Sequence, residues 1–271
     1  MADAPDLAAV TAAQQRTWSD GDFSRVGSMI NGVAEHLAEA LDLLPDDRVL
    51  DVATGSGNGA IAAARRTWVG ATGTDFVPAL LERGRERAAV ERLEVEFIEA
   101  DVQELPFEDA SFDVITSIFG AMFAPDQERT AREMLRVVKP GGRIGMANWT
   151  PDGALSDFFV ILSNHVGGPP PGTVPPVLWG NEQHARGLFG DGISAMRVER
   201  RVSRQAFRSP EHYIDFFRTY FGPMKAAFDK VGPEGAPALE ADLLAYLEKV
   251  NSNERALVLE PDYLQIVAIR A

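Results

Sequence analysis

The feature that most constrains this chain is the stretch VLDVATGSGNGA, which runs from Val49 to Ala60. A short β-branched, apolar run ends in an acid, and alternating glycines follow it. This layout is typical of a buried strand that turns tightly into a helix and leaves its backbone open to a ligand. It predicts a nucleotide-type pocket, and it leaves open whether the ligand carries a pyrophosphate.

Strands and helices alternate after this loop. The hydrophobic pattern predicts strands at Arg48–Ala53, Trp68–Asp75, Leu93–Asp101, Phe112–Phe119 and Arg143–Thr150. It predicts intervening helices at Asn58–Arg66, Val77–Glu91 and Pro125–Val138, the last one followed by a turn at Lys139–Gly142. Such alternation predicts an α/β fold with a doubly wound, mainly parallel sheet.

The flanking segments are expected to belong to one domain, 1–271. Two helices, Leu7–Trp18 and Val26–Leu43, predict a helical cap over residues 1–47, ahead of a core at 48–150. Residues 151–253 predict a lid with a proline-rich loop at Gly167–Pro176, an extended segment at Met196–Phe207, and helices at Glu182–Phe189, Pro210–Phe221 and Ala236–Val250. The apolar end, 254–271, is expected to rejoin the sheet as a terminal strand.

The acidic composition limits the kind of partner. The formal net charge is −14 and the sequence pI is near 4.7, so the field of the protein would repel nucleic-acid backbones. The densest basic stretch, Arg197–Arg208, alternates like the exposed face of a strand. The chain has no cysteine, no H-E-x-x-H motif, no signal-peptide pattern and no apolar run of membrane-spanning length. We expect a cytoplasmic protein without a metal site that acts on a small molecule or a protein.

The glycine loop alone fits a dinucleotide site. Gly55, Gly57 and Ala60 match G-x-G-x-x-G/A, and Asp75 lies where an acid would bind a ribose. Asp51 argues against this interpretation, because a carboxylate beside the glycines is unfavourable near a pyrophosphate and favourable near an ammonium or sulfonium group. The loop also lacks the lysine of a P-loop.

Three successive strands are each predicted to carry an acid at the carboxyl end, the edge where open α/β sheets bind ligands. Asp51 and Asp75 belong to the first two strands, and Asp101 followed by Val102 ends the third. Asp75 can accept hydrogen bonds from both ribose hydroxyls, and Asp101 from an adenine amino group. The set predicts a ligand with an amino group, a ribose, an adenine and no phosphate. Singly, Asp75 could instead cap the next helix and Asp101 could form a turn.

At this point the residues resemble the class I S-adenosylmethionine-dependent methyltransferases. LDVATGSGNG is similar to their first motif, D-x-G-x-G-x-G, with Ala53 in place of the first glycine. GTDF is similar to the second motif, EADVQELPFEDASFDVI to the third and fourth, and MLRVVKPGGRIGMANW to the end of the core. The resemblance covers Arg48–Trp149 and is greatest to the branch that includes quinone and natural-product methyltransferases.

The resemblance implies a Rossmann-like sheet of seven strands, with the last one or two antiparallel. It also implies S-adenosyl-L-methionine as cofactor and S-adenosyl-L-homocysteine as product. The cofactor-binding residues that it implies are Asp51, Ala53, Gly55, Gly57, Asp75, Phe76, Asp101, Val102 and Ser117.

The methyl acceptor is expected over the carboxyl ends of the fourth and fifth strands, under the cap and the lid. Both of these are rich in aromatic side chains, which predicts an apolar cavity for a small aromatic or hydrophobic molecule. Candidate lining residues are Trp18, Phe23, Phe119, Met122, Trp149 and Trp179. His165 and His184 are the candidate general bases, although methyl transfer needs a base only when the acceptor must lose a proton.

Alternatives to methyl transfer remain at this level. A protein of this kind could retain the cofactor and catalyse a different reaction, such as a cyclisation, or bind the cofactor without turnover. The strand-four sequence TSIFGA lacks the N-P-P-Y type of motif that amino-methylating DNA and protein enzymes carry. The sequence does not identify the acceptor, its O, N or C nucleophile, or the oligomeric state.

Overall fold

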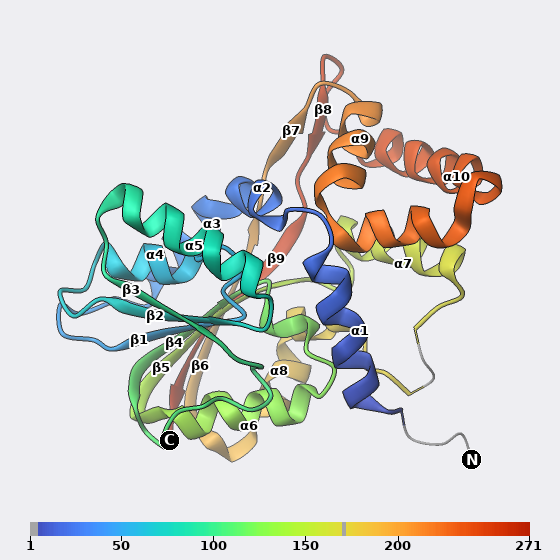
Figure 1. Cartoon of the computed structure of the whole chain (residues 1–271). Coiled ribbons are helices and arrows are strands. Elements are labelled where there is room, and N and C mark those ends of the chain that lie inside the picture. Colours follow the sequence, from blue (N-terminus) through green and yellow to red (C-terminus); the bar gives the residue numbers. More distant parts are fainter. Residues whose placement is uncertain (1–4, 170–171) are drawn as a thin grey trace.

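The core of the molecule is a seven-stranded sheet in the order β3-β2-β1-β4-β5-β9-β6 (Figure 1). The computed structural model describes residues 5–169 and 172–271. The strands are β1 (Val49–Val52), β2 (Ala71–Asp75), β3 (Val95–Glu99), β4 (Phe112–Ile118), β5 (Val138–Trp149), β6 (Ile193–Val202) and β9 (Asp262–Arg270). The first five are parallel, and β9 runs antiparallel to both β5 and β6. The predicted α/β class and mainly parallel seven-stranded sheet are confirmed.

Helices cover both faces of the sheet. One face carries α3 (Asn31–Ala40), α4 (Asn58–Ala64) and α5 (Pro78–Glu91), and the other carries α6 (Gln127–Val137) and α8 (Glu182–Phe189) (Figure 1). All four residues of β1 are buried, which is what a central parallel strand covered on both faces requires. With both faces covered, ligands of such a sheet are expected at the carboxyl ends of its parallel strands.

The N-terminal segment differs from the prediction in one respect. Helix α1 (Leu7–Ser19) is as expected, with its start capped by Asp6. The predicted helix Val26–Leu43 is wrong as a single element: α2 (Phe23–Gly27) and the short helix η1 (Ser28–Ile30) precede α3. Asp22 caps α2 by accepting a hydrogen bond from Ser24, so a local capping signal starts the first turn earlier than the apolar pattern suggested.

A second apolar core forms beside the sheet. Helices α7 (Ala154–Val166), α9 (Pro210–Tyr220) and α10 (Gly222–Val250) pack together there, next to a two-stranded ribbon of β7 (Gln205–Phe207) and β8 (Leu257–Leu259) (Figure 1). The predicted extended segment Met196–Phe207 is two strands, of which β6 starts at Ile193. The predicted helix Ala236–Val250 lies in the part of α10 that follows a break at Gly232, where the φ is 65°; the part before this break was not predicted.

Two further predictions need correction or restriction. The predicted turn Lys139–Gly142 lies inside β5, where the pairing jumps from Phe112↔Val138 to Val114↔Arg143 and Gly141 has a φ of 74°. It is a bulge in the strand, because the partner strand continues on both sides of it. The predicted proline loop Gly167–Pro176 contains residues 170–171, which lie outside the described residues, and a short helix, η3 (Pro176–Gly180), begins at its end.

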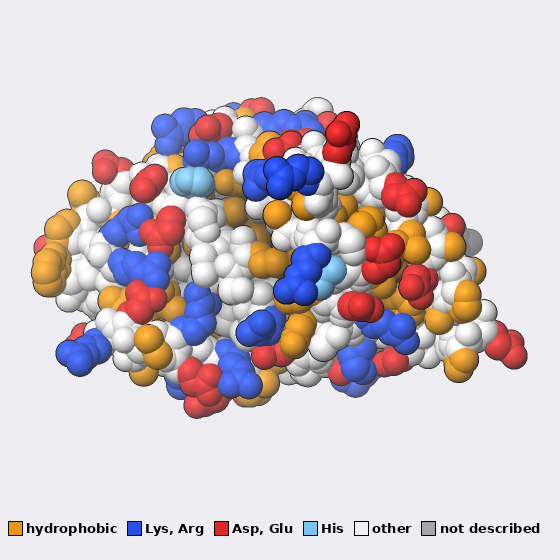
Figure 2. All heavy atoms as spheres, turned by 90° about the horizontal axis from the view of Figure 1, so that it is seen from above, with side chains coloured by type: hydrophobic (Ala, Val, Ile, Leu, Met, Phe, Trp, Pro, Cys, Tyr) orange, Lys and Arg blue, Asp and Glu red, His pale blue; other side chains and the backbone are white. Residues whose placement is uncertain are grey.

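The surface carries charges of both signs. Seen from above in Figure 2, basic and acidic side chains are interspersed, and apolar side chains lie between them. Among residues 5–169 and 172–271, no helix has the length and apolar character needed to cross a bilayer.

Candidate cofactor and acceptor site

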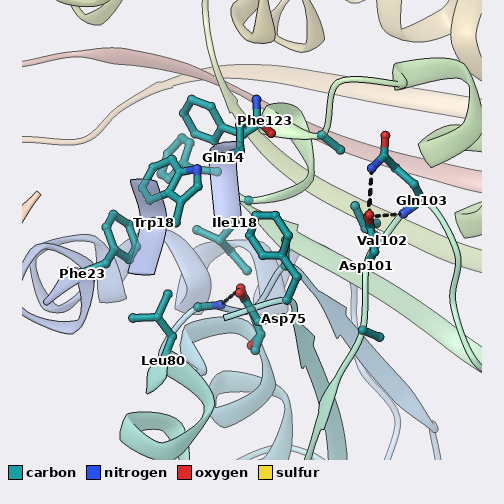
Figure 3. A pocket seen from close by; sticks show the side chains of 18 of the residues that line it. Gln14, Trp18, Phe23, Asp75, Leu80, Asp101, Val102, Gln103, Ile118 and Phe123 are labelled. Carbon is teal, nitrogen blue, oxygen red and sulfur yellow. Dashed lines mark hydrogen bonds between the residues drawn. The ribbon is translucent and has the colours of Figure 1, made fainter. Parts of the chain in front are cut away.

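A cavity lies at the carboxyl ends of the strands, under the N-terminal helices. Its empty space is about 760 Å³, including the part that is open to solvent. One wall comes from the segments that follow β1, β2, β3 and β4, and the other from α1 and α2 (Figure 3). We call these the strand-end wall and the helical wall.

The glycine loop after β1 bends through left-handed backbone conformations. The φ angles are 49° at Ala53, 57° at Gly55 and 88° at Gly57. Ala53 occupies the position where the resemblance expects a glycine, and it adopts the conformation that a glycine would favour, at a cost of roughly 1 kcal/mol. The loop thereby exposes the backbone at Ala53, Thr54 and Gly55 to the cavity.

Asp51 supports this loop from inside. Its Oδ2 accepts hydrogen bonds from Thr54 Oγ1 and from the Ala60 N–H at 3.0 Å, and its Oδ1 accepts one from Thr116 Oγ1 at 2.8 Å. A Cβ at Gly59 would overlap Asp51 Oδ1, so only glycine leaves room for the carboxylate. The side chain is 1% exposed and does not line the cavity, so its influence on a ligand would be electrostatic.

Asp75 lies at the end of β2 and lines the cavity. Its Oδ2 accepts a hydrogen bond from the Gly55 N–H at 2.8 Å, and its Oδ1 accepts one from the Val77 N–H at 2.9 Å. A carboxylate has about four acceptor positions, so these two bonds leave capacity for the two hydroxyls of a ribose. Phe76, which follows it, also lines the cavity.

The two buried carboxylates lack a cationic partner. Burial raises the pKa of Asp51 to about 6. Burial, together with the nearby charge of Asp51, raises the pKa of Asp75 to about 6. The hydrogen-bond donors described for both are hydroxyl and backbone N–H groups, and no Lys, Arg or His is among the described residues that line the cavity. This site therefore favours a cationic ligand and disfavours a pyrophosphate.

Asp101 follows β3 and faces the cavity together with Val102 (Figure 3). Its carboxylate accepts hydrogen bonds from the backbone N–H and the side-chain Nε2 of Gln103. Val102 is 7% exposed, so its apolar side chain forms part of a tight surface against which a planar ring can pack. Asp75 and Asp101 are thus brought to one cavity, as the sequence predicted.

The helical wall and the segment after β4 that faces it both present aromatic side chains to the cavity. Trp18 of α1 packs edge-on against Phe23 at 5.3 Å and against Phe123 at 5.1 Å between ring centroids, and all three line the cavity (Figure 3). Phe119 also lines it, with a φ of 55° that turns the chain at the end of β4. Most of the lining surface on this side is apolar, which suits a hydrophobic or aromatic acceptor.

Several predicted site residues lie elsewhere. Gly57 and Ser117 do not line the cavity, and Ser117 instead bonds the Val52 carbonyl and the Ala121 N–H. Met122 and Trp179 are fully buried in the core of the sheet. Trp149 stacks behind Phe119, with ring centroids 3.6 Å apart, and supports that residue without lining the cavity itself.

The two candidate histidines are also outside the cavity. His165, on α7, pairs with Asp242 of α10 at 2.7 Å. His184, on α8, contacts Gln127 of α6 at 2.7 Å. Within the described part of the chain, Asp75 and Asp101 are the ionisable side chains that line the cavity.

The sequence did not single out some residues that do line the cavity, namely Thr11, Gln14, Ile30, Thr54, Asn58, Leu80 and Gln103. Gln103 lies inside the EADVQELPF motif, two residues after Asp101, so its proximity to that acid was a signal. Thr11 and Gln14 carried no such signal, because only the packing of α1 decides which of its faces meets the sheet.

The fold defines a doubly wound α/β protein with a cavity at the carboxyl ends of its parallel strands. A family profile described as a methyltransferase domain matches residues 49–142. An uncharacterized protein of Mycobacterium tuberculosis is 34% identical over 237 residues, which cover 86% of this chain and 85% of the relative. The demethylmenaquinone methyltransferase of Deinococcus radiodurans is 41% identical over 132 residues, 48% of this chain and 54% of that protein.

Among solved structures, the YcgJ protein of Bacillus subtilis matches with a TM-score of 0.62 at 20% identity, over 88% of this chain and 98% of that one. This similarity supports the fold. The chain belongs to the class I S-adenosylmethionine-dependent methyltransferase family.

Proposed function

We propose that this protein transfers the methyl group of S-adenosylmethionine to an O, N or C nucleophile of a small aromatic or hydrophobic molecule. The observation that carries the proposal is the convergence of Asp75 and Asp101 on one cavity beside the glycine loop. When bound, S-adenosylmethionine would supply a methyl carbon on a sulfonium for in-line attack by the acceptor, and S-adenosylhomocysteine would be the leaving group. The chain would bind it, align it and exclude water.

The residues have separable binding tasks in this proposal. Asp101 would accept a hydrogen bond from the adenine amino group, and Val102 would pack on the ring. Asp75 would bind the ribose hydroxyls. The negative potential of Asp51 and Asp75 would stabilise the ammonium and sulfonium groups, and the backbone at Ala53 and Gly55 permits close approach.

The aromatic part of the cavity lining supports the choice of acceptor. Trp18, Phe23 and Phe123 present ring surfaces to the cavity, and the lining holds no cation among its described residues that could bind a phosphate or carboxylate. Since His165 and His184 lie outside it, we propose that an acceptor which must lose a proton does so to solvent or to a group that enters with it.

Calorimetry with S-adenosylmethionine, S-adenosylhomocysteine and NAD tests the cofactor. We expect both adenosyl compounds to bind and NAD not to bind; tight binding of NAD alone would overturn the proposal. Asp75→Ala is expected to weaken binding of S-adenosylmethionine about 100-fold, because it removes a buried, charged acceptor. Asp46→Ala, which changes an exposed aspartate, is the matched control and should leave affinity unchanged.

Methyl transfer itself needs a second experiment. The protein is incubated with isotopically labelled S-adenosylmethionine and a library of aromatic metabolites, and mass spectrometry searches for the labelled methyl group in a product. A labelled product is expected. Cofactor binding without any labelled product would instead support the alternatives, a different reaction on the same fold or binding without turnover.

A further inference from the structure

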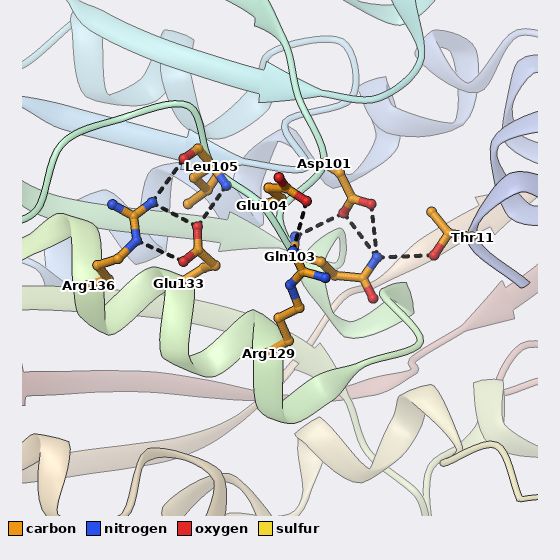
Figure 4. Close-up of polar contacts among 8 residues, drawn as sticks. All are labelled: Thr11, Asp101, Gln103, Glu104, Leu105, Arg129, Glu133 and Arg136. Atoms are coloured by element: carbon orange, nitrogen blue, oxygen red, sulfur yellow. Dashed lines mark hydrogen bonds and ion pairs between the residues drawn. The ribbon is translucent and has the colours of Figure 1, made fainter. Parts of the chain in front are cut away.

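The side chain of Gln103 connects three segments around the cavity. It is 7% exposed, and its Nε2 donates hydrogen bonds to Asp101 Oδ2 at 2.9 Å and to Thr11 Oγ1 at 3.1 Å (Figure 4). Its Oε1 accepts a hydrogen bond from the Asp126 N–H at 2.9 Å. One amide therefore joins the acid after β3, the helix α1, and the loop that leads from β4 into α6.

The partners fix the orientation of this amide. The carboxylate of Asp101 only accepts and the backbone N–H of Asp126 only donates, so the nitrogen must face Asp101. The hydroxyl of Thr11 donates to the Leu7 carbonyl at 3.0 Å and so presents a lone pair to Gln103. Each hydrogen-bonding group of the buried amide has a partner. Exchanging the amide nitrogen and oxygen would break the hydrogen bonds to Asp101 and Asp126.

The segment that carries Gln103 is held firmly on its other side. Glu104 pairs with Arg129 at 2.8 Å, and Glu133 accepts a hydrogen bond from the Leu105 N–H at 2.8 Å. Arg136 donates to the Leu105 carbonyl at 2.9 Å (Figure 4). Three side chains of α6 thus fix the chain just after Asp101, so the position of Gln103 does not depend on α1 alone.

Helix α1 is held less firmly. None of its residues is fully buried, and its two hydrogen bonds to the strand-end wall are Thr11 with Gln103 and Gln15 with the Phe76 carbonyl, at 2.6 Å. Each of these bonds ends one or two residues after an acid that lines the cavity. Each of these hydrogen bonds makes a modest net contribution to stability, so we expect the loss of either one to loosen α1.

We propose that Gln103 is a positioning residue that couples the cofactor site to α1. It orients the Asp101 carboxylate toward the adenine and, through Thr11, holds α1 across the cavity. Loss of the Thr11 bond then speeds the escape of the bound nucleoside, and loss of the whole amide also weakens its binding to Asp101. This inference rests on the proposed function, because it requires an adenosyl ligand in the cavity.

The test compares two threonines of α1. Thr11→Val and Thr17→Val are the same substitution in the same helix, and both hydroxyls bond a carbonyl four residues earlier, but only Thr11 reaches Gln103. We expect Thr11→Val to raise the dissociation rate of S-adenosylhomocysteine roughly 3- to 10-fold in stopped-flow experiments. Thr17→Val should leave it unchanged, and Gln103→Met should raise both the dissociation rate and the Kd.

A spectroscopic signal separates positioning from general loosening. Trp18 lies on α1, and Trp68, which is 85% exposed, is first changed to phenylalanine. Because Trp149 and Trp179 are buried, the part of the remaining tryptophan emission that acrylamide quenches then reports how well α1 covers the cavity. We expect increased quenching in Thr11→Val and Gln103→Met, with an unchanged melting temperature for Thr11→Val. Equal rates and equal quenching in the two valine variants would overturn the inference. Absence of adenosyl binding to the parent protein would instead refute the proposed function.

Discussion

The two walls of the cavity are built in different ways. At the strand-end wall, the side chains of Asp51 and Asp75 are 1% and 5% exposed. Apart from Thr116, their hydrogen-bond donors lie within about 20 positions of them in the sequence. On the helical wall, α1 has no fully buried residue. Its two hydrogen bonds to the strand-end wall join residues that are 61 and 92 positions apart in the sequence.

This difference indicates a division of tasks. A wall set by strand ends and backbone N–H groups is rigid and would fix the cofactor. A wall held by a few side-chain hydrogen bonds and aromatic edges can open at low cost, which cofactor exchange and acceptor entry both require. The predictions below test that contrast, from the largest expected effect to the smallest.

Gly59→Ala should damage the strand-end wall most. The new Cβ would overlap Asp51 Oδ1 and lie 2.5 Å from Ile118 Cδ1, so we expect the free energy of unfolding to fall by about 3 kcal/mol and adenosyl binding to be lost. The control is Gly32→Ala in α3, where a Cβ meets nothing within 4 Å. It should raise stability by about 0.5–1 kcal/mol in denaturant unfolding. Equal effects of the two substitutions would contradict the prediction.

The pH dependence should reveal the buried carboxylates. Their pKa values of about 6 in the folded protein lie above the ordinary aspartate value of 3.8, so the folded state binds protons more tightly than the unfolded state. Ionisation of Asp51 and Asp75 therefore destabilises the folded protein. Their effect on the free energy of unfolding is most favourable below pH 4, and this free energy should fall as the pH rises to about 6. Since one pKa unit is about 1.4 kcal/mol, the change over this range is a few kcal/mol.

The same groups predict the opposite trend for binding. Protonation below pH 6 removes the negative charge that would attract a sulfonium and an ammonium, so affinity for S-adenosylmethionine should fall as the pH is lowered from 7 to 5. Calorimetry across this range, with denaturant unfolding of the ligand-free protein alongside it, checks both trends. An affinity that is independent of pH would show that these carboxylates do not act on the ligand.

Trp18→Ala should affect the helical wall only. Because Trp18 is partly exposed, we expect a loss of about 1–2 kcal/mol in the free energy of unfolding, less than for a fully buried aromatic residue. The matched control is Trp68→Ala, at a site 85% exposed, which should be close to neutral. If Trp18→Ala lowered the free energy of unfolding more than Gly59→Ala does, in thermal or denaturant unfolding, the helical wall would have to be regarded as the more rigid one.

Much of the strand-end wall was predictable from the sequence because its signals are local. A strand, a glycine turn and an acid follow one another within a few residues, and strand polarity then brings Asp75 and Asp101 to one edge. The role of Asp51 was less predictable. Its place in the motif predicted that it lies at the carboxyl edge of the sheet. Its hydrogen bonds with Ala60 and Thr116, however, hold it beneath the glycine loop, away from the cavity surface.

The helical wall was much less predictable. Aromatic residues at helical spacing fit a core and a cavity equally well, so Trp18 and Phe23, which line the cavity, could not be told from Trp179, which is buried. His165 and His184 flank the proline-rich loop in the sequence, but each packs against another helix away from the site.

By itself, the sequence determined the α/β class, the parallel core, and the acids and glycines at its open edge, because these depend on periodicity and on neighbours along the chain. Only the tertiary structure decided which face of α1 covers the cavity and that Gln103 joins α1 to Asp101. Those contacts unite residues up to 92 positions apart, and their existence depends on how helices pack on the finished sheet.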